Sequence, residues 1–309
     1  MPETVPPVIE ITDLWVEYKT PGRRLTAVSG LNLSIDKGEV VGFIGPNGAG
    51  KTTTIKVLIG FLSPTRGQVR VFGERAGGIE ARRRMGYLPE VALYYPFLTA
   101  REALRLYARL ADIPPDGREE TISALLGRVG LTGREDESLR TFSKGMLQRV
   151  GIAQAIMGAP DLLILDEITS GLDPVARHDV RKLLLEFKAR GKTVFFSSHE
   201  LSEVTLLCDR VILIDAGKVI EERSLDTLMD LIQRYVTVAE IESLPDSLPE
   251  GVFLQSVQGK RYSFVAESPK GQTELATMLE GLDARVVSTG QEAGSLEDYF
   301  VRTIGHKIT

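Results

Sequence analysis

The chain has 309 residues, of which 43% are hydrophobic and 26% are charged, and these values exclude a disordered or fibrous protein. Its 37 basic and 42 acidic residues give a net charge of −5, so no nucleic-acid partner is expected from overall charge. The single cysteine, Cys208, cannot form an intrachain disulfide, which favours a reducing, cytoplasmic setting. We find neither a signal-peptide pattern nor the ~18 uninterrupted apolar residues of a membrane helix.

The first part of the chain alternates strand-like and helix-like segments, the pattern of a layered α/β domain. The expected strands are short apolar runs at residues 8–18, 31–35, 39–44, 162–165, 193–197 and 211–214. Further along, Thr99 and Glu102 have the spacing of a capping box, and apolar residues then recur at helical intervals. A second helix is expected at 119–129. We predict that these helices form a subdomain, about residues 91–158, inserted into an α/β domain that spans residues 1–225.

The remainder, residues 226–309, is predicted to be a small α+β accessory domain. Its expected elements are helices at 225–233 and 274–279 and strands at 236–241, 252–257 and 261–266. Near the end of the chain, Leu296, Tyr299 and Phe300 share one face of a predicted helix. That helix either docks onto the chain or makes a dimer or regulatory contact, and we assign no chemistry to this domain.

The strongest motif is GPNGAGKT at residues 45–52, which fits the phosphate-loop pattern G-x-x-x-x-G-K-[ST]. It follows an expected strand and precedes a helix expected at 53–59. Glycines let successive backbone N–H groups turn toward phosphate oxygens, and the helix N-terminus adds partial positive charge. The lysine would neutralise phosphate charge, and the hydroxyl of Thr52 would bind Mg²⁺. The residues predicted to bind nucleotide are Gly45, Asn47, Gly48, Gly50, Lys51, Thr52 and Thr53.

A second motif, LLILDE at residues 162–167, ends a buried strand with two carboxylates. Ligands of open α/β sheets bind at the carboxyl ends of the strands, so both acids are expected near the phosphate loop. Asp166 suits Mg²⁺ binding, and Glu167 suits polarisation of an attacking water. An apolar run that ends in two acids is by itself an ordinary strand end. Downstream of a phosphate loop, however, it predicts a catalytic pair.

With these motifs in this order, residues 8–225 resemble an ATP-binding cassette ATPase, the motor subunit of ABC transporters. The resemblance implies that Tyr18 stacks on adenine, with Trp15 as the competing aromatic residue. The segment FSKGM at residues 142–146 occupies the place of the family signature, commonly written LSGGQ. Ser143 and Gly145 retain the serine hydroxyl and the free N–H group that would face a γ-phosphate at a helix start.

Two further segments extend the resemblance. The sequence SGLD at residues 170–173 matches the family's D-loop, which assigns Asp173 to the nucleotide site. His199 matches the switch histidine that contacts the γ-phosphate and acts in catalysis. We interpret His178 and His306 as structural or exposed histidines.

The chain departs from the family pattern at four positions. Lys144 and Met146 replace residues of the signature, and Ile168 replaces a proline often found after the two carboxylates. Glu90 stands in place of the Q-loop glutamine; it retains an oxygen ligand for Mg²⁺ but adds a negative charge and loses the amide donors. The signature and Glu90 together look like the bacterial exporter branch whose membrane subunits are separate chains.

The resemblance implies an ATPase that uses ATP and Mg²⁺ and works as a dimer of cassettes. Because the chain has one phosphate loop, the second ABC subunit is expected to be another copy of this chain. It implies integral membrane permease subunits as further partners, and therefore a peripheral location on the cytoplasmic face of the membrane. A soluble ABC-type ATPase that acts on ribosomes or nucleic acid is the alternative.

Overall fold

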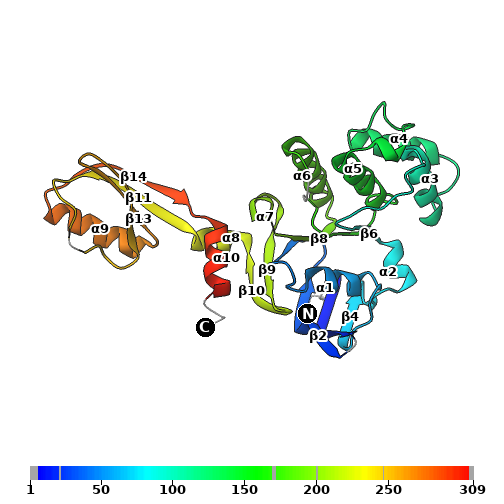
Figure 1. Cartoon of the computed structure of the whole chain (residues 1–309), viewed down its shortest axis with the longest axis horizontal. Helices are drawn as coiled ribbons and strands as arrows, with labels where there is room; N and C mark the ends of the chain where they lie inside the picture. Colours follow the sequence, from blue (N-terminus) through cyan, green and yellow to red (C-terminus); the bar gives the residue numbers. More distant parts are fainter. Residues whose placement is uncertain (1–5, 21, 169–171, 200, 246, 306–309) are drawn as a thin grey trace, which may run out of the picture. The chain divides into compact units, whose positions relative to one another are not determined.

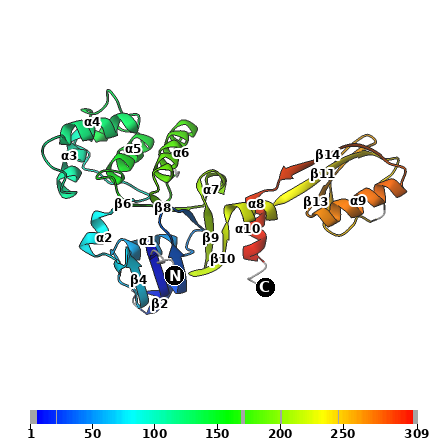
Figure 2. The same ribbon diagram turned by 180° about the vertical axis from the view of Figure 1, so that it is seen from behind.

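The structure is a computed structural model and describes residues 6–20, 22–168, 172–199, 201–245 and 247–305. The chain divides into two compact units, residues 1–223 and 224–309, close to the boundary predicted after residue 225. Figure 1 shows the whole chain, and Figure 2 shows it from behind. In the part of the chain that the structure describes, no helix is long and apolar enough to span a membrane.

A six-stranded sheet is central to the first unit, with the strand order β10-β9-β3-β8-β7-β6. Its strands are β3 (Val40–Ile44), β6 (Met85–Leu88), β7 (Leu162–Leu165), β8 (Thr193–Ser198), β9 (Arg210–Asp215) and β10 (Lys218–Ser224). The pairs β3/β8, β3/β9, β6/β7 and β7/β8 are parallel. Every residue of β3, β7 and β8 is buried, which explains their unbroken apolar sequences. The carboxyl ends of these strands therefore meet at one edge.

A second sheet is antiparallel, with the order β2-β1-β4-β5. Its strands are β1 (Ile9–Thr20), β2 (Arg23–Ile35), β4 (Arg66–Val71) and β5 (Glu74–Arg75). The prediction that the second strand starts at residue 31 was wrong, because β2 pairs with β1 along its whole length, from Arg23 opposite Thr20 to Ile35 opposite Ile9. Gly30, at φ 68°, interrupts the apolar alternation without ending the strand. Four strands of this unit, β4, β5, β6 and β10, were not predicted.

The core of the first unit joins the two sheets through helix α1 (Lys51–Leu58). Ile55 and Leu58 of α1 are buried in one cluster with Leu14 from the antiparallel sheet and with Phe43 and Phe195 from the parallel sheet. The rings of Phe43 and Phe195 lie 5.3 Å apart between centroids. This packing holds the start of α1, and therefore the phosphate loop, against the end of β3.

The remaining helices of this unit are α2 (Ile79–Arg83), α3 (Ala100–Leu110), α4 (Arg118–Arg128), the 3₁₀ turn η1 (Leu139–Thr141), α5 (Lys144–Ala155), α6 (Pro174–Ala189) and α7 (Leu201–Leu207). The predicted capping box at the start of α3 is confirmed: Thr99 Oγ1 accepts from the N–H of Glu102 at 3.1 Å, and the Glu102 carboxylate accepts from the N–H of Thr99 at 2.9 Å. Helices α3, α4 and α5 group together in Figures 1 and 2.

The second unit is a four-stranded antiparallel sheet, in the order β12-β13-β11-β14, packed against helix α9. Its elements are α8 (Leu225–Leu231), β11 (Gln233–Glu240), β12 (Val252–Gln258), β13 (Arg261–Ala266), α9 (Pro269–Gly281), β14 (Arg285–Ala293) and α10 (Leu296–Gly305). Phe264, Leu275 and Leu279 are completely buried at the centre of its core. Strand β14 was not predicted, and the first predicted helix ends earlier, because β11 begins at Gln233.

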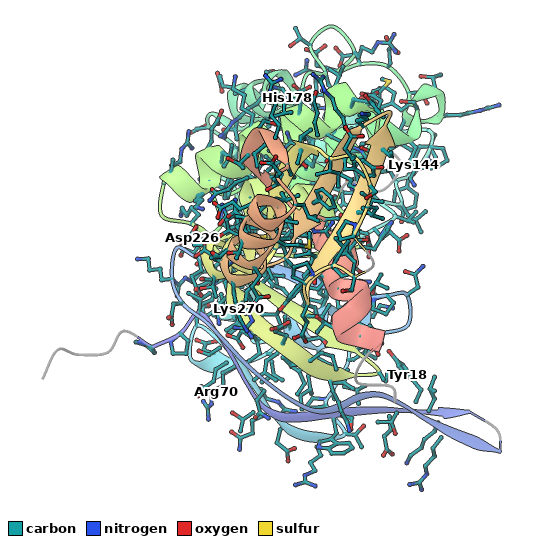
Figure 3. All side chains as sticks on the ribbon, turned by 90° about the vertical axis from the view of Figure 1, so that its left-hand side faces the viewer. Tyr18, Arg70, Lys144, His178, Asp226 and Lys270 are labelled. Atoms are coloured by element: carbon teal, nitrogen blue, oxygen red, sulfur yellow. The ribbon has the colours of Figure 1, made fainter. Side chains whose placement is uncertain are left out.

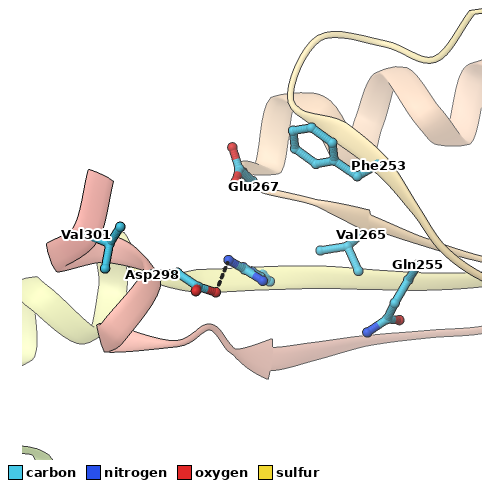
Figure 4. Close-up of a pocket in the computed structure, with 7 residues that line it drawn as sticks. Phe253, Gln255, Val265, Glu267, Asp298 and Val301 are labelled. Carbon is cyan, nitrogen blue, oxygen red and sulfur yellow. Dashed lines mark hydrogen bonds and ion pairs between the residues drawn. The ribbon is translucent and has the colours of Figure 1, made fainter. Parts of the chain in front are cut away.

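Helix α10 buries the apolar face that the sequence predicted. Leu296 and Phe300 are buried, and Tyr299 is half-buried. Asp298 forms an ion pair with Arg234 at 3.5 Å, and both residues line a cavity of about 420 Å³ together with Phe253, Val265 and Glu267 (Figure 4). The burial favours a docking helix, and a dimer or regulatory contact of this helix stays a hypothesis.

Candidate functional site

The phosphate loop connects β3 to α1, and two of its glycines are required by close backbone packing. A Cβ atom on Gly45 would lie 2.1 Å from the carbonyl oxygen of Ile214, and one on Gly50 would lie 2.6 Å from the carbonyl oxygen of Ala27. Gly50 also has φ 107°, a conformation that L side chains rarely adopt. Neighbouring strands of the protein therefore leave no room for side chains at Gly45 and Gly50. This constraint adds to the one that a bound phosphate would impose.

Lys51 is the first residue of α1, and its ammonium group is buried within this loop. Its Nζ atom donates to the carbonyl oxygens of Gly45 at 2.6 Å and Pro46 at 3.2 Å, and lies 3.3 Å from Oε1 of Glu167. The N-cap, Gly50, provides no side-chain cap for α1. The N–H groups of the first turn are therefore available to an anion, next to a buried positive charge.

The two predicted carboxylates lie at the end of β7, beside the loop. The hydroxyl of Thr52 donates to Oδ1 of Asp166 at 3.3 Å, and the hydroxyl of Ser197 donates to the same oxygen at 2.6 Å. Both acids are buried. The burial of the Tyr87 side chain, together with the negative charge of Asp166, raises the pKa of Tyr87 to about 12. The oxygens of Thr52 and Asp166 are hard donors of the kind that Mg²⁺ prefers, so these two residues fit that ion.

His199 follows β8 and lies against the second carboxylate. Its Nδ1 atom is 2.6 Å from Oε2 of Glu167, while about half of the His199 side chain is exposed, at 51%. The carboxylate of Glu167 is thus held by Lys51 on one oxygen and by His199 on the other. The sequence predicted all three residues but not these contacts between them.

Tyr18, on β1, contacts the first turn of α1, next to the phosphate loop. Its hydroxyl is 3.3 Å from Oγ1 of Thr53, and the side chain is half-buried (Figure 3 labels Tyr18). The competing aromatic residue, Trp15, donates its indole N–H to Asp13 at 2.8 Å instead. Tyr18 is therefore the aromatic residue that the structure brings to the loop.

Asn47 and Gly48 lie in the loop between β3 and α1, and Asn47 is exposed.

The signature residues lie at the start of α5. Ser143 is the N-cap of α5, and its Oγ atom accepts from the N–H of Met146 at 3.2 Å. Ser143 is exposed and Gly145 is half-buried. Among the described residues, no hydrogen bond or ion pair joins either of them to the phosphate loop.

The other predicted residues are placed as follows. Asp173 caps α6 by accepting from the N–H of Ala176 at 2.8 Å; residues 169–171, which include two of the D-loop, lie outside the described residues. Glu90 is exposed just beyond the end of β6. His178 is exposed, and His306 lies outside the described residues. Sequence reasoning missed Ser197, whose only signal was its place in the strand before His199.

Comparisons with known proteins agree with this geometry. Residues 28–170 match the ABC transporter family. An uncharacterized ABC transporter ATP-binding protein of Nostoc sp. is 35% identical, over 99% of this chain and 92% of that protein. The bacitracin transport ATP-binding protein of Bacillus licheniformis is 36% identical, over 96% of this chain and 97% of that protein.

The fold is also similar to that of solved structures. A dimeric ATP-binding cassette in a post-hydrolysis state, bound to ADP and Pi, superimposes with a TM-score of 0.66 and is 25% identical, covering 70% of this chain and 98% of that one. This confirms the predicted P-loop ATPase fold of the first unit. The chain belongs to the ABC transporter family, as an ATP-binding subunit that hydrolyses ATP.

Proposed function

We propose that this chain powers an exporter whose membrane-spanning subunits are separate chains. The observation that carries the ATPase part is the convergence of Lys51, Glu167 and His199 beside the phosphate loop. In this proposal Lys51 and the first turn of α1 bind the β- and γ-phosphates. The remaining residues of the phosphate loop surround the phosphates, and Tyr18 stacks on the adenine.

Glu167 is the proposed general base. Its carboxylate accepts a proton from the attacking water, and its contacts with Lys51 and His199 restrict the positions it can adopt. Thr52 and Asp166 would hold Mg²⁺, with Glu90 as a further oxygen ligand. Bound Mg²⁺ supplies positive charge to the phosphate oxygens. His199 would also contact the γ-phosphate from the end of β8.

The second half of each site is proposed to come from another copy of the chain. Ser143, Gly145 and Asp173 lie at the starts of α5 and α6, and among the described residues no hydrogen bond or ion pair joins them to the chain's own phosphate loop. Their N–H groups and the serine hydroxyl suit a γ-phosphate presented by a partner. The dimeric state of the related solved cassette supports this arrangement. ATP would then bridge two copies, and hydrolysis would release them.

The proposed contact with the membrane subunits is a surface between the parallel sheet and the inserted helices. A cavity of about 620 Å³ there is lined by apolar residues such as Ile79 and Leu110 and by charged residues such as Arg82 and Arg83. Just past Glu90, the side chains of Val91, Leu93, Tyr95 and Phe97 are all exposed. Exposed apolar residues in such number mark an interaction surface. Through it the chain would lie on the cytoplasmic face of a membrane.

Nothing in the comparisons favours the alternative of a ribosomal or nucleic-acid ATPase, and relatives carry transport or resistance names, for bacitracin and for linearmycin. The transported substrate of this chain would be selected by its membrane subunits.

The membrane part is tested by cross-linking in membranes of cells that express the tagged chain. We expect the wild type to capture a protein with several membrane helices. The double variant Leu93→Ser and Phe97→Ser should lose that capture and keep its basal ATPase activity, because both side chains are exposed. The control is Val175→Ser, which changes an apolar residue on α6 that is also largely exposed, at 69% against 84% for Leu93 and 75% for Phe97. Capture of ribosomal proteins by the wild type, with no membrane protein, would support the alternative instead.

A further inference from the structure

Ser197, near the end of β8, lies completely buried between the two acids at the end of β7. Its Oγ atom is 2.6 Å from Oδ1 of Asp166 and 3.1 Å from the backbone nitrogen of Glu167. The backbone oxygen of Ser197 accepts from the same N–H of Glu167 at 3.2 Å. Ser197 is therefore hydrogen-bonded to both members of the predicted catalytic pair, Asp166 and Glu167.

The direction of these hydrogen bonds follows from the chemistry of the groups. An ionised carboxylate only accepts, and a hydroxyl has a single hydrogen to donate. The Ser197 hydroxyl must therefore donate to Asp166 and accept from Glu167. Thr52 also donates to Oδ1, at 3.3 Å, so the hydroxyl groups of Thr52 and Ser197 both donate to the same oxygen of Asp166. The rotamer of Asp166 is thereby fixed from two sides.

The backbone at Glu167 needs such support. Its φ is 51°, in the left-handed region that non-glycine residues rarely adopt. Conformations of this kind persist where the surrounding structure holds them, and they concentrate at functional sites. Here the hydroxyl and the carbonyl oxygen of Ser197 hold the N–H of Glu167. This turn directs the Glu167 carboxylate toward Lys51 and His199.

We infer that Ser197 is a positioning residue for ATP hydrolysis. It holds the Asp166 carboxylate in the orientation for Mg²⁺ beside Thr52, and it holds the turn that presents Glu167. It acts through these two residues and contacts no nucleotide. The inference deepens the proposed function and rests on it, because it requires Asp166 and Glu167 to have the roles proposed above.

The test uses Ser197→Ala in the full chain, with Thr193→Val as a matched control. Thr193 lies on the same strand and is equally buried, and its hydroxyl accepts from the N–H of Gly38 at 2.9 Å, far from the acids. Each variant deletes one buried hydroxyl that hydrogen-bonds to a backbone N–H. Three quantities are measured: the melting temperature, steady-state ATP hydrolysis, and binding of a fluorescent non-hydrolysable ATP analogue as Mg²⁺ is titrated or removed with EDTA.

We expect Ser197→Ala to raise the Mg²⁺ concentration at half-saturation by about tenfold or more, the scale seen when a group that orients a metal ligand is lost. Its kcat should fall by a similar factor, while analogue binding in EDTA stays at the wild-type level. Thr193→Val should lower the melting temperature as much as Ser197→Ala does, but it should leave the Mg²⁺ dependence unchanged. The inference about Ser197 would be overturned if Ser197→Ala had the Mg²⁺ dependence of the wild type, or if Thr193→Val changed the Mg²⁺ dependence as much as Ser197→Ala. Neither result would affect the proposed function. A wild-type chain that binds no analogue would defeat the proposed function itself.

Discussion

Nδ1 of His199 lies 2.6 Å from Oε2 of Glu167, although the two residues belong to segments that end different strands of the parallel sheet. Strands β7 and β8 are direct parallel neighbours, so their carboxyl ends bring the carboxylate and the imidazole together. The other oxygen of Glu167 faces the ammonium group of Lys51. The carboxylate is therefore held in place by two other side chains of the same chain.

The first prediction concerns Glu167 as general base. Glu167→Gln keeps the shape of the side chain but removes the basic oxygen, so ATP binding should persist while kcat falls by about 10²-fold or more. The ATP-bound dimer should accumulate, which size-exclusion chromatography with ATP and Mg²⁺ measures. Hydrolysis near the wild-type rate would remove Glu167 from this role.

The second prediction concerns Lys51. Lys51→Ala removes the buried counter-charge for the phosphates, and we expect ATP affinity to fall at least tenfold, as is typical when a charge-assisted hydrogen bond is lost. Equilibrium binding of radiolabelled ATP measures the effect. Lys56→Ala, on the same helix but outside the loop, is the control. Unchanged ATP affinity in Lys51→Ala would show that the ammonium group does not contact the phosphates.

The third prediction concerns the dimer. Ser143→Arg should block hydrolysis at a site formed with another copy, because the proposed function has Ser143 face the γ-phosphate bound by a partner chain. Mixing Ser143→Arg chains with Lys51→Ala chains should then leave one composite site with both defects and one with neither. ATPase activity of the mixture should exceed that of either variant alone. If heterodimers form and the mixture shows no such recovery, each chain completes its own site.

The fourth prediction concerns the second unit. Because all the predicted nucleotide-site residues lie in residues 1–223, a chain that ends at Arg223 should bind ATP as the full chain does. If the second unit is regulatory, the truncation should weaken ATP-dependent dimerisation or change turnover severalfold. Analytical ultracentrifugation and steady-state kinetics distinguish these results. A stable truncated chain with unchanged dimerisation and turnover, alone and with its membrane partner, would end the regulatory hypothesis.

The fifth prediction concerns stability and pH. Asp161 accepts from Lys192 at 2.7 Å and from Arg84 at 2.9 Å, and these hydrogen bonds lower the pKa of its carboxyl below the usual value. A lowered pKa contributes stability above the unfolded-state pKa, about 3.9, and this stability is lost as the pH falls through the folded-state pKa. Because the pair is partly exposed, Asp161→Asn should cost about 1 kcal/mol or less at pH 7.

Urea unfolding of the wild type and Asp161→Asn at pH 7, 5 and 3 measures this difference. The two proteins should converge in unfolding free energy only at the lowest pH. A difference that stays constant from pH 7 to 3 would contradict the assignment. Asp283→Asn, in the second unit, tests whether loss of any carboxylate has the same effect.

Local patterns in the sequence determined much of this protein. The GPNGAGKT loop, the apolar run that ends in Asp166 and Glu167, and the capping box of α3 are each encoded within a few neighbouring residues. Short-range sterics, burial of a strand on both faces and helix capping act at that same range. Such features could therefore be predicted, together with the family.

Only the tertiary structure decided which of those residues touch. The full length of β2 depends on its register with β1, and β14 exists because β11 offers it a partner. Likewise, the hydroxyl of Ser197 meets Asp166 and Glu167 only because β8 pairs in parallel with β7 in one particular register. A register is set by the packing of the whole sheet, where a shift of one residue would turn every side chain to the opposite face. No local pattern around Ser197 carries that information.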